Sequence, residues 1–238
     1  MNNTPIKSII KPTKFEGVYE TQKGKNIILL TKSQSKGDSV YGETIFSDGK
    51  DEYREWVANR SKLAAFMLKG ADQINIKPGS VVLYLGASTG TTVSHVSDIV
   101  GQDGKPGFIF AIEYAPRVAR ELVFLSSKRN NIAPILGDAA RPETYMSKCS
   151  EVDIIYQDVA QRNQVEIFLR NINMFLKKGG FGLLAIKARS IDVTERPDRI
   201  FEVVKKQLLD PANQLLLIDH RRIDPFQKDH AMFLVKRK

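Results

Sequence analysis

The sequence predicts an α/β fold: a mostly parallel sheet with an antiparallel edge hairpin, preceded by a small β-rich domain. Three observations predict it. Apolar runs alternate with helical patterns from residue 81 to residue 209, which is typical of parallel strands joined by crossover helices. The last two apolar runs, 215–218 and 231–236, have no helical pattern between them, so we expect an antiparallel pair. Residues 1–50 contain short strand-like runs between turn residues.

The small N-terminal β-rich domain is predicted to span residues 1–50, and the larger domain residues 51–238. Within the small domain, the runs 18–21 and 27–31 flank a turn that contains glycine. A third run, 39–46, follows a Lys-Gly-Asp turn and carries aromatic and β-branched residues, so it is also predicted to be a strand. Because these runs form little core of their own, we expect the small domain to pack against the larger one.

In the larger domain, segments with helical periodicity alternate along the sequence with strand-like runs. The segment 56–70 is predicted to be helical in its second half, where Leu63, Phe66 and Met67 share one face. Further helices are predicted at residues 93–100, 115–125, 165–175 and 197–209. Strands are predicted at residues 81–85, 108–112, 132–136, 152–156 and 181–186.

Composition limits the class of protein. Hydrophobic residues make up 42% of the 238 residues, which supports a substantial core, and 36 Lys and Arg against 27 Asp and Glu give a formal net charge of +9. That charge favours a polyanionic partner such as RNA, although a lysine-rich surface alone would produce it too. The single Cys149 excludes an intramolecular disulfide and suits a reducing compartment. Since the sequence shows neither a long apolar run nor a Cys/His cluster with ligand spacing, we expect no membrane span and no metal.

The most informative segment is the strand-like run 81–85 together with the glycine loop 86–90 that follows it. Ligands of open α/β sheets bind where the strands end, and glycine lets the backbone approach them closely. The dinucleotide fingerprint G-x-G-x-x-G would need glycine where this chain has Ser88, so a pyrophosphate site is poorly supported.

Two carboxylates follow the next two predicted strands. Glu113 ends the second strand, where an acid can accept hydrogen bonds from two ribose hydroxyls, and Asp138 follows the third, where it can accept the adenine amino group. Singly, the loop could be only a tight turn and Asp138 only a helix N-cap. Together they predict a Rossmann-like class I S-adenosylmethionine methyltransferase sheet.

Four polar residues are expected at the same edge of the sheet. Lys62 lies on the helix before the first strand of this sheet, and Asp158 follows the fourth strand. Lys187 follows the fifth strand, and His230 opens the last. Singly, a strand-end lysine usually just reaches water and a lone histidine is usually structural, but the joint pattern favours catalysis.

The chemistry that suits these residues is attack by a ribose 2′-hydroxyl on a methyl-sulfonium, for which the hydroxyl must lose its proton. Lys187 is the predicted base, because partial burial and a second cation, Lys62, would favour its neutral form. Asp158 is expected to orient the ammonium groups, and it could instead cap a helix or contact the methionine part of the cofactor. His230 is expected to hold the target ribose or to shuttle the proton.

With these residues in view, the chain resembles the fibrillarin family, in particular the archaeal fibrillarin-like rRNA/tRNA 2′-O-methyltransferases. The matching segments are 60–65, 84–101, 137–142, 157–161, 187–190 and 229–232. The resemblance implies a catalytic tetrad of Lys62, Asp158, Lys187 and His230. It also implies cofactor contacts at Gly86, Ala87, Thr91, Thr92, Glu113, Tyr114, Asp138, Ala139, Asp158, Val159, Ala160 and Gln161.

The resemblance further implies partners. Family members work in a C/D-box guide ribonucleoprotein, where a Nop-domain scaffold protein holds the methyltransferase and a kink-turn-binding, ribosomal-protein-like subunit holds the guide RNA. The guide RNA pairs with rRNA or tRNA and selects the nucleotide. We therefore expect RNA-guided 2′-O-ribose methylation with S-adenosyl-L-methionine as cofactor. The sequence has no glycine-arginine-rich tail like that of eukaryotic members, so we expect an archaeal-type, cytoplasmic protein.

The chain departs from the family pattern at residues 56–59, where Trp-Val-Ala-Asn replaces a motif with proline. We expect this change to loosen the start of the helix that carries Lys62. Three other functions stay open: a methyltransferase for proteins or small molecules, a non-catalytic subunit of an RNA particle, and a nucleotide-dependent oxidoreductase. The tetrad argues against the first, and the missing dinucleotide fingerprint argues against the last.

Overall fold

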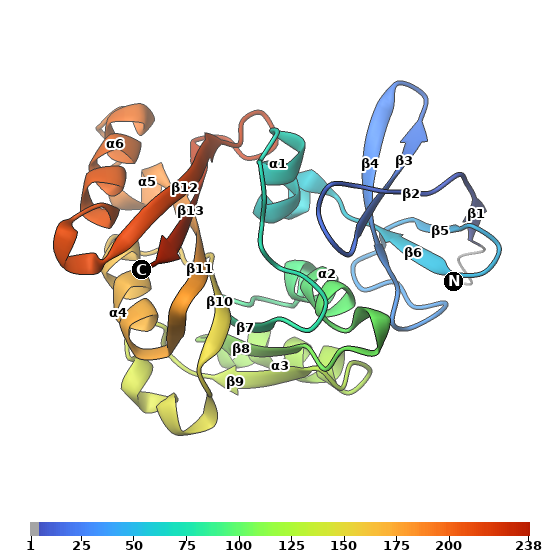
Figure 1. Cartoon of the computed structure of the whole chain (residues 1–238), viewed down its shortest axis with the longest axis horizontal. Helices are drawn as coiled ribbons and strands as arrows, with labels where there is room; N and C mark the ends of the chain where they lie inside the picture. Colours follow the sequence, from blue (N-terminus) through green and yellow to red (C-terminus); the bar gives the residue numbers. More distant parts are fainter. Residues whose placement is uncertain (1–4) are drawn as a thin grey trace.

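A computed structural model describes residues 5–238, and Figure 1 shows a small N-terminal sheet beside a larger α/β unit. The small sheet has the order β1–β5–β6–β4–β3–β2, in which β3 and β4 form an antiparallel hairpin. The two strands predicted for this hairpin are therefore confirmed. The strands are β1 (Ile6–Lys7), β2 (Lys11–Pro12), β3 (Val18–Lys23), β4 (Asn26–Lys32), β5 (Ile45–Ser47) and β6 (Glu52–Glu55).

The run 39–46 was wrongly predicted to be a strand throughout. Only its last two residues are extended, because the buried Glu43 carboxylate accepts hydrogen bonds from the backbone N–H groups of Val40 and Tyr41 and turns the chain back. Strand β6 pairs with β4 and β5, so the small sheet continues past the predicted boundary at residue 50. The division of the chain into two domains at that residue stays a prediction.

The larger sheet has the order β12–β13–β11–β10–β7–β8–β9. Strands β7 to β11 run parallel, whereas β13 pairs antiparallel with both β11 and β12, so the predicted edge hairpin is confirmed. The strands are β7 (Val81–Leu85), β8 (Phe108–Glu113), β9 (Ile132–Leu136), β10 (Val152–Gln157), β11 (Leu176–Lys187), β12 (Leu215–Arg222) and β13 (His230–Arg237).

The helices follow the predicted positions closely, although α4 ends at Phe175 and β11 begins before the glycine pair 179–180 that was expected to separate them. The α-helices are α1 (Lys62–Leu68), α2 (Thr91–Val100), α3 (Pro116–Ser126), α4 (Gln164–Phe175), α5 (Ala188–Ile191) and α6 (Pro197–Leu208). Short 3₁₀ turns are η1 (Ala58–Arg60), η2 (Gln102–Gly104), η3 (Pro142–Thr144), η4 (Met146–Lys148) and η5 (Pro211–Asn213). Within residues 5–238, none of these helices is long and apolar enough to cross a membrane.

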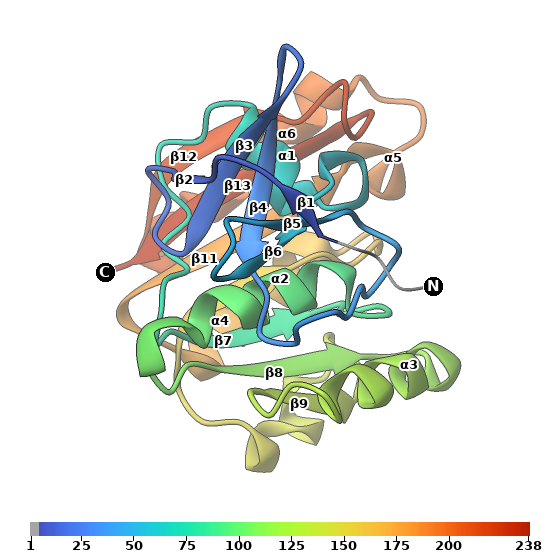
Figure 2. The same cartoon turned by 90° about the vertical axis from the view of Figure 1, so that its right-hand side faces the viewer.

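Hydrophobic clusters cover both faces of the larger sheet. Val82 and Tyr84 of β7 belong to the cluster that includes α1, α2 and α3, whereas Leu83 and Leu85 belong to the cluster that includes α4 and α6. This alternation follows from the two-residue period of a strand. The small sheet joins the first cluster, and Figure 2 shows it next to α2, so the expected packing of the small domain on the larger unit is confirmed.

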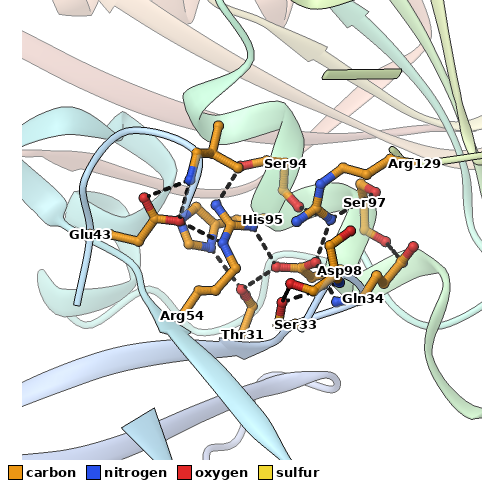
Figure 3. Close-up of polar contacts among 12 residues, drawn as sticks. Thr31, Ser33, Gln34, Glu43, Arg54, Ser94, His95, Ser97, Asp98 and Arg129 are labelled. Carbon is orange, nitrogen blue, oxygen red and sulfur yellow. Dashed lines mark hydrogen bonds and ion pairs between the residues drawn. The ribbon is translucent and has the colours of Figure 1, made fainter. Parts of the chain in front are cut away.

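A buried charge cluster, shown in Figure 3, ties the small sheet to α2. Arg54 of β6 donates hydrogen bonds to Glu43 (2.6 Å), to Asp98 of α2 (2.7 Å) and to Ser94 of α2 (2.8 Å). Arg129 donates to the other oxygen of Asp98 at 2.5 Å. All four charged side chains are almost completely buried, and their two positive and two negative charges balance.

Candidate active site

The four predicted catalytic residues meet at the carboxyl edge of the larger sheet. Asp158 follows β10 directly, and its backbone N–H donates to the carbonyl of Leu85 at 2.9 Å. Lys62 is the first residue of α1, and its Nζ lies 2.8 Å from Oδ2 of Asp158. Lys187 ends β11 and is the register partner of His230, which begins β13. Two residue pairs, one an ion pair and one a strand pair, therefore form the site.

Helix α1 starts at Lys62 because of local capping. The Ser61 side chain accepts a hydrogen bond from the Ala64 N–H and another from the Thr92 hydroxyl, at 3.4 Å and 3.0 Å. Trp56, just upstream, is 1% exposed and stacks on His95 with ring centroids 4.9 Å apart. The start of α1 is thus held by a side-chain cap and follows a buried, stacked ring, and the expectation that the missing proline loosens it stays a prediction.

The Lys62–Asp158 ion pair changes the expected electrostatics. Its side chains are 21% and 26% exposed, so the pair is partly screened by solvent. We expected Lys62 to act on Lys187 as a second cation, with Asp158 orienting the ammonium groups and partly opposing that effect. Because Asp158 compensates its charge at 2.8 Å, Lys62 instead acts as one half of a nearly neutral pair.

His230 is held in one tautomer. Its Nδ1 lies 2.6 Å from the carbonyl of Lys228, so Nδ1 carries the proton and donates, leaving Nε2 as an acceptor. Burial is the main cause that lowers the pKa of His230 below its ordinary value, and the charges of Lys62 and Lys187 lower it further. The Lys228 carbonyl and Asp158 oppose this shift. Within residues 5–238 nothing hydrogen-bonds to Nε2, so the neutral imidazole can accept a donor there.

Gln164 is a residue that the sequence analysis missed. Its fully buried side chain accepts a hydrogen bond from the Lys187 N–H at 3.3 Å and donates to the Lys187 carbonyl at 3.5 Å. In turn the Gln157 side chain donates to the Gln164 carbonyl at 2.7 Å. These contacts fix the end of β11 in place. A glutamine on the buried side of an amphipathic helix was the only sequence signal for this role.

A cavity of about 230 Å³ opens at the ends of β7, β8, β9 and β10. Every predicted cofactor residue except Ala87, Thr91 and Thr92 lines this cavity. Three further lining residues were not predicted: Ser88, Ile112 and Gly137. The lining residues are Gly86, Ser88, Ile112, Glu113, Tyr114, Gly137, Asp138, Ala139, Asp158, Val159, Ala160 and Gln161.

Three predicted cofactor residues lie outside this cavity. Ala87 is 3% exposed, and the Thr92 hydroxyl donates to Ser61 instead of facing the cavity. Thr91 lines a different hollow, which the small domain helps to form. Direct side-chain contact of these residues with a cofactor stays a prediction that the geometry does not favour.

Glu113 has both a structural and a binding capacity. Its Oε2 accepts the Ser88 N–H at 2.8 Å, and its Oε1 accepts the Ala115 N–H at 2.9 Å. Each carboxylate oxygen has a second acceptor position, so Glu113 can still receive two hydroxyl donors. Asp138 is similar: Oδ1 accepts the Ala140 N–H at 2.9 Å, and further acceptor positions stay open. These two carboxylates can therefore accept hydrogen bonds from the hydroxyls of a ribose and from an amino group.

Gly86 is required by a close backbone approach. Its φ of +80° lies in the left-handed region, and an added Cβ would lie 2.4 Å from the carbonyl oxygen of Asp158. The glycine loop therefore lies directly against the segment that carries Asp158, whose carboxylate is predicted to be catalytic.

Residues 9–238 match the family model described as Fibrillarin. The chain belongs to the fibrillarin family. A fibrillarin-like rRNA/tRNA 2′-O-methyltransferase of Methanocaldococcus jannaschii is 49% identical over 235 residues, which cover 98% of this chain and 97% of the relative. The resemblance seen in the sequence is thereby confirmed.

Two solved fibrillarin structures also match. Aeropyrum pernix fibrillarin, in complex with natively bound S-adenosyl-L-methionine, has a TM-score of 0.87 at 43% identity and covers 97% of this chain and 99% of its own. A chain of a fibrillarin/Nop5p complex has a TM-score of 0.83 at 40% identity and covers 95% of this chain and 100% of its own. These matches confirm the predicted methyltransferase fold.

Proposed function

We propose that this fibrillarin-family protein is the catalytic subunit of a C/D-box ribonucleoprotein and performs RNA-guided 2′-O-ribose methylation of rRNA and tRNA. The observation that carries the proposal is the meeting of the Lys62–Asp158 ion pair with the Lys187–His230 strand pair at one sheet edge. That edge adjoins the cavity that contains Glu113 and Asp138.

S-adenosyl-L-methionine is the proposed cofactor, and when bound it supplies an activated methyl group. Glu113 and Asp138 would hold its ribose and adenine, and the loop at Gly86 would let the backbone come close to it. Asp158 lines the cavity and also binds Lys62, so it links the cofactor site to the catalytic residues.

The target hydroxyl needs a group that takes its proton. Lys187 is the proposed base, positioned through its backbone by Gln164. His230, neutral and with Nε2 free to accept, would hold the ribose hydroxyl or pass its proton on. Lys62 would keep the Asp158 carboxylate in place beside the cofactor cavity.

The partners proposed are a Nop-domain scaffold protein, a kink-turn-binding subunit, the guide RNA and the target RNA. The fibrillarin of the matching complex assembles with Nop5p, which supports the scaffold partner. The +9 net charge suits contact with RNA backbones. A cytoplasmic location stays a prediction.

The test is methyl transfer to a guide-matched RNA by the chain together with the scaffold and kink-turn proteins. We expect methylation of one nucleotide, which moves when the guide sequence is changed. A non-catalytic subunit would give no transfer in any combination, and a methyltransferase for proteins or small molecules would be indifferent to the guide. Either result would refute the proposed function.

A further inference from the structure

A second hollow of about 530 Å³ lies between the small domain and the larger unit. We call it the interdomain hollow; its lining includes Tyr41, Arg60, Thr89, Thr91 and Phe124. Gly86 and Ser88 line the cofactor cavity, whereas Thr89 and Thr91 line the interdomain hollow. The same short segment therefore separates the two spaces.

Arg60 is the notable side chain of this hollow. It is exposed, and its guanidinium carbon lies 5.1 Å from the centroid of the Tyr41 ring, in a cation–π arrangement. No ion pair or side-chain hydrogen bond involves its guanidinium among residues 5–238. An arginine that is held in place while its five N–H donors stay unused is suited to bind a phosphate.

The Tyr41 ring is itself held in place by the contacts of its hydroxyl group. Its hydroxyl donates to the Glu55 carbonyl at 2.8 Å and lies 2.8 Å from Nε2 of His95. His95 is fully buried, is stacked on Trp56 and bonds to Thr31 next to the charge cluster of Figure 3. The Tyr41 ring under Arg60 is therefore held by several contacts, which should lower the entropic cost of binding through it.

The position of Arg60 relates it to the reaction. Only Ser61 separates it from Lys62, and two residues of chain span at most about 7 Å. A strand whose ribose reaches Lys62 and Asp158 would thus bring a neighbouring phosphate near Arg60. Phe124, 59% exposed, and the hydroxyls of Thr89 and Thr91 offer further contacts to a nucleotide.

We propose that Arg60, stacked on Tyr41, binds a phosphodiester of the target RNA strand beside the nucleotide that is methylated. This inference rests on the proposed function, since it names the surface that holds the substrate of the same site. Of the two carboxylates in the hollow, Asp38 is paired with Lys128 at 3.0 Å. Glu121 has no ion pair within residues 5–238, and its removal should favour RNA binding.

The first experiment uses the assembled particle and measures the target-RNA concentration that gives half the maximal single-turnover rate. For Arg60→Ala we expect this concentration to rise about tenfold, as for one lost charge-assisted hydrogen bond. When the logarithm of this concentration is plotted against the logarithm of the salt concentration, the slope should be lower by about one, which corresponds to one lost phosphate contact. The maximal rate and the cofactor Kd should stay unchanged.

Matched variants separate charge, stacking and fold. Lys178→Ala removes one exposed positive charge at the start of β11, far along the strand from Lys187, and should change neither the half-saturating concentration nor the salt slope. Arg60→Lys should keep the slope but not the full affinity. Tyr41→Leu should weaken RNA binding more than Tyr41→Phe, which keeps the ring, and Glu121→Gln should strengthen it.

A neutral methylphosphonate placed next to the target nucleotide identifies the strand. In the target strand it should weaken binding to the unmodified protein but add little to the loss in Arg60→Ala. A loss that appears only when the guide strand carries the neutral linkage would overturn the proposal. So would an Arg60→Ala protein that behaves like Lys178→Ala, or one that loses only maximal rate. A particle that is inactive even with the unmodified chain would instead refute the proposed function.

Discussion

His230 and Lys187 face each other across a strand pair, and both could take the proton of the target hydroxyl. They differ in how they are held. His230 is fixed by the Lys228 carbonyl and is neutral through burial, so it accepts a proton at Nε2 without first losing one. Lys187 is exposed, and its backbone alone is fixed by Gln164. Substitution of Lys187 therefore decides between them.

We predict that Lys187→Ala abolishes methyl transfer while leaving the cofactor Kd nearly intact, because the proposed base would contribute to the transition state and not to cofactor binding. Lys187→Arg should fail almost as badly, since a guanidinium does not give up its proton in a protein. The measurement is the single-turnover rate in the assembled particle across neutral and mildly alkaline pH. A near-normal rate for Lys187→Arg would make Lys187 a positioning residue and leave His230 as the better candidate base.

At the scale of elements, the glycine loop and the segment after β10 depend on each other. Gly86 and Gly179 have nearly the same φ, +80° and +77°, but an added Cβ meets the Asp158 carbonyl at 2.4 Å in the first case and nothing within 4 Å in the second. Alanine at Gly179 therefore costs only the left-handed conformation, about 1–2 kcal/mol. We predict that Gly86→Ala lowers the Tm further and also weakens cofactor binding. Equal melting shifts and equal cofactor Kd values in the two variants would contradict the close approach.

The buried charge cluster is a second place where two elements depend on each other, in this case β6 and α2. Asp98 accepts hydrogen bonds from Arg54, Arg129 and the Thr31 hydroxyl. Asp98→Ala would leave two arginines buried without this partner, so we predict a loss of about 3–5 kcal/mol in the free energy of unfolding. Thr31→Val, which removes a neutral hydroxyl with contacts to Asp98 and His95, should cost less because it leaves no charge unpaired. Chemical denaturation of both variants measures the difference, and similar losses would show that the ionic contacts contribute little.

Sequence reasoning recovers the elements whose signals are local. The strand–loop–helix pattern at 81–100 and the residues at strand ends are predictable because parallel strands end at one edge. The turn made by Glu43 and the clamp made by Gln164 are not predictable, since the first depends on a side chain that replaces a backbone partner and the second on a contact between segments distant in sequence. A contact of Asp158 with a lysine ammonium group was expected, but only the folded structure shows that the lysine is Lys62.

At the scale of the whole molecule, two buried histidines make stability depend on pH. Burial lowers the pKa of both His95 and His230 below the ordinary value of 6.5. Between the folded and the unfolded pKa the unfolded chain binds more protons, so the free energy of unfolding rises with pH. We predict that stability falls as the pH drops below 6.5 and that His95→Gln flattens much of this slope. Denaturant titrations at several pH values check it, and an unchanged slope in His95→Gln would contradict it.

The catalytic edge stays open to solvent in the isolated chain. The side chains of Lys62 and Asp158 are 21% and 26% exposed, and Lys187 is exposed, so water screens the charges that are proposed to act on the hydroxyl. Docked RNA and partner proteins would exclude that water and position the ribose.

We predict that the isolated chain binds S-adenosyl-L-methionine but methylates RNA poorly. The cofactor at a hundred times its Kd should stabilise the fold by about 2.7 kcal/mol, and NAD should not. Thermal melts with each compound, followed by methyl transfer with and without the partners, test both halves. Strong, site-selective methylation by the chain alone would show that its own surface is enough to order the substrate.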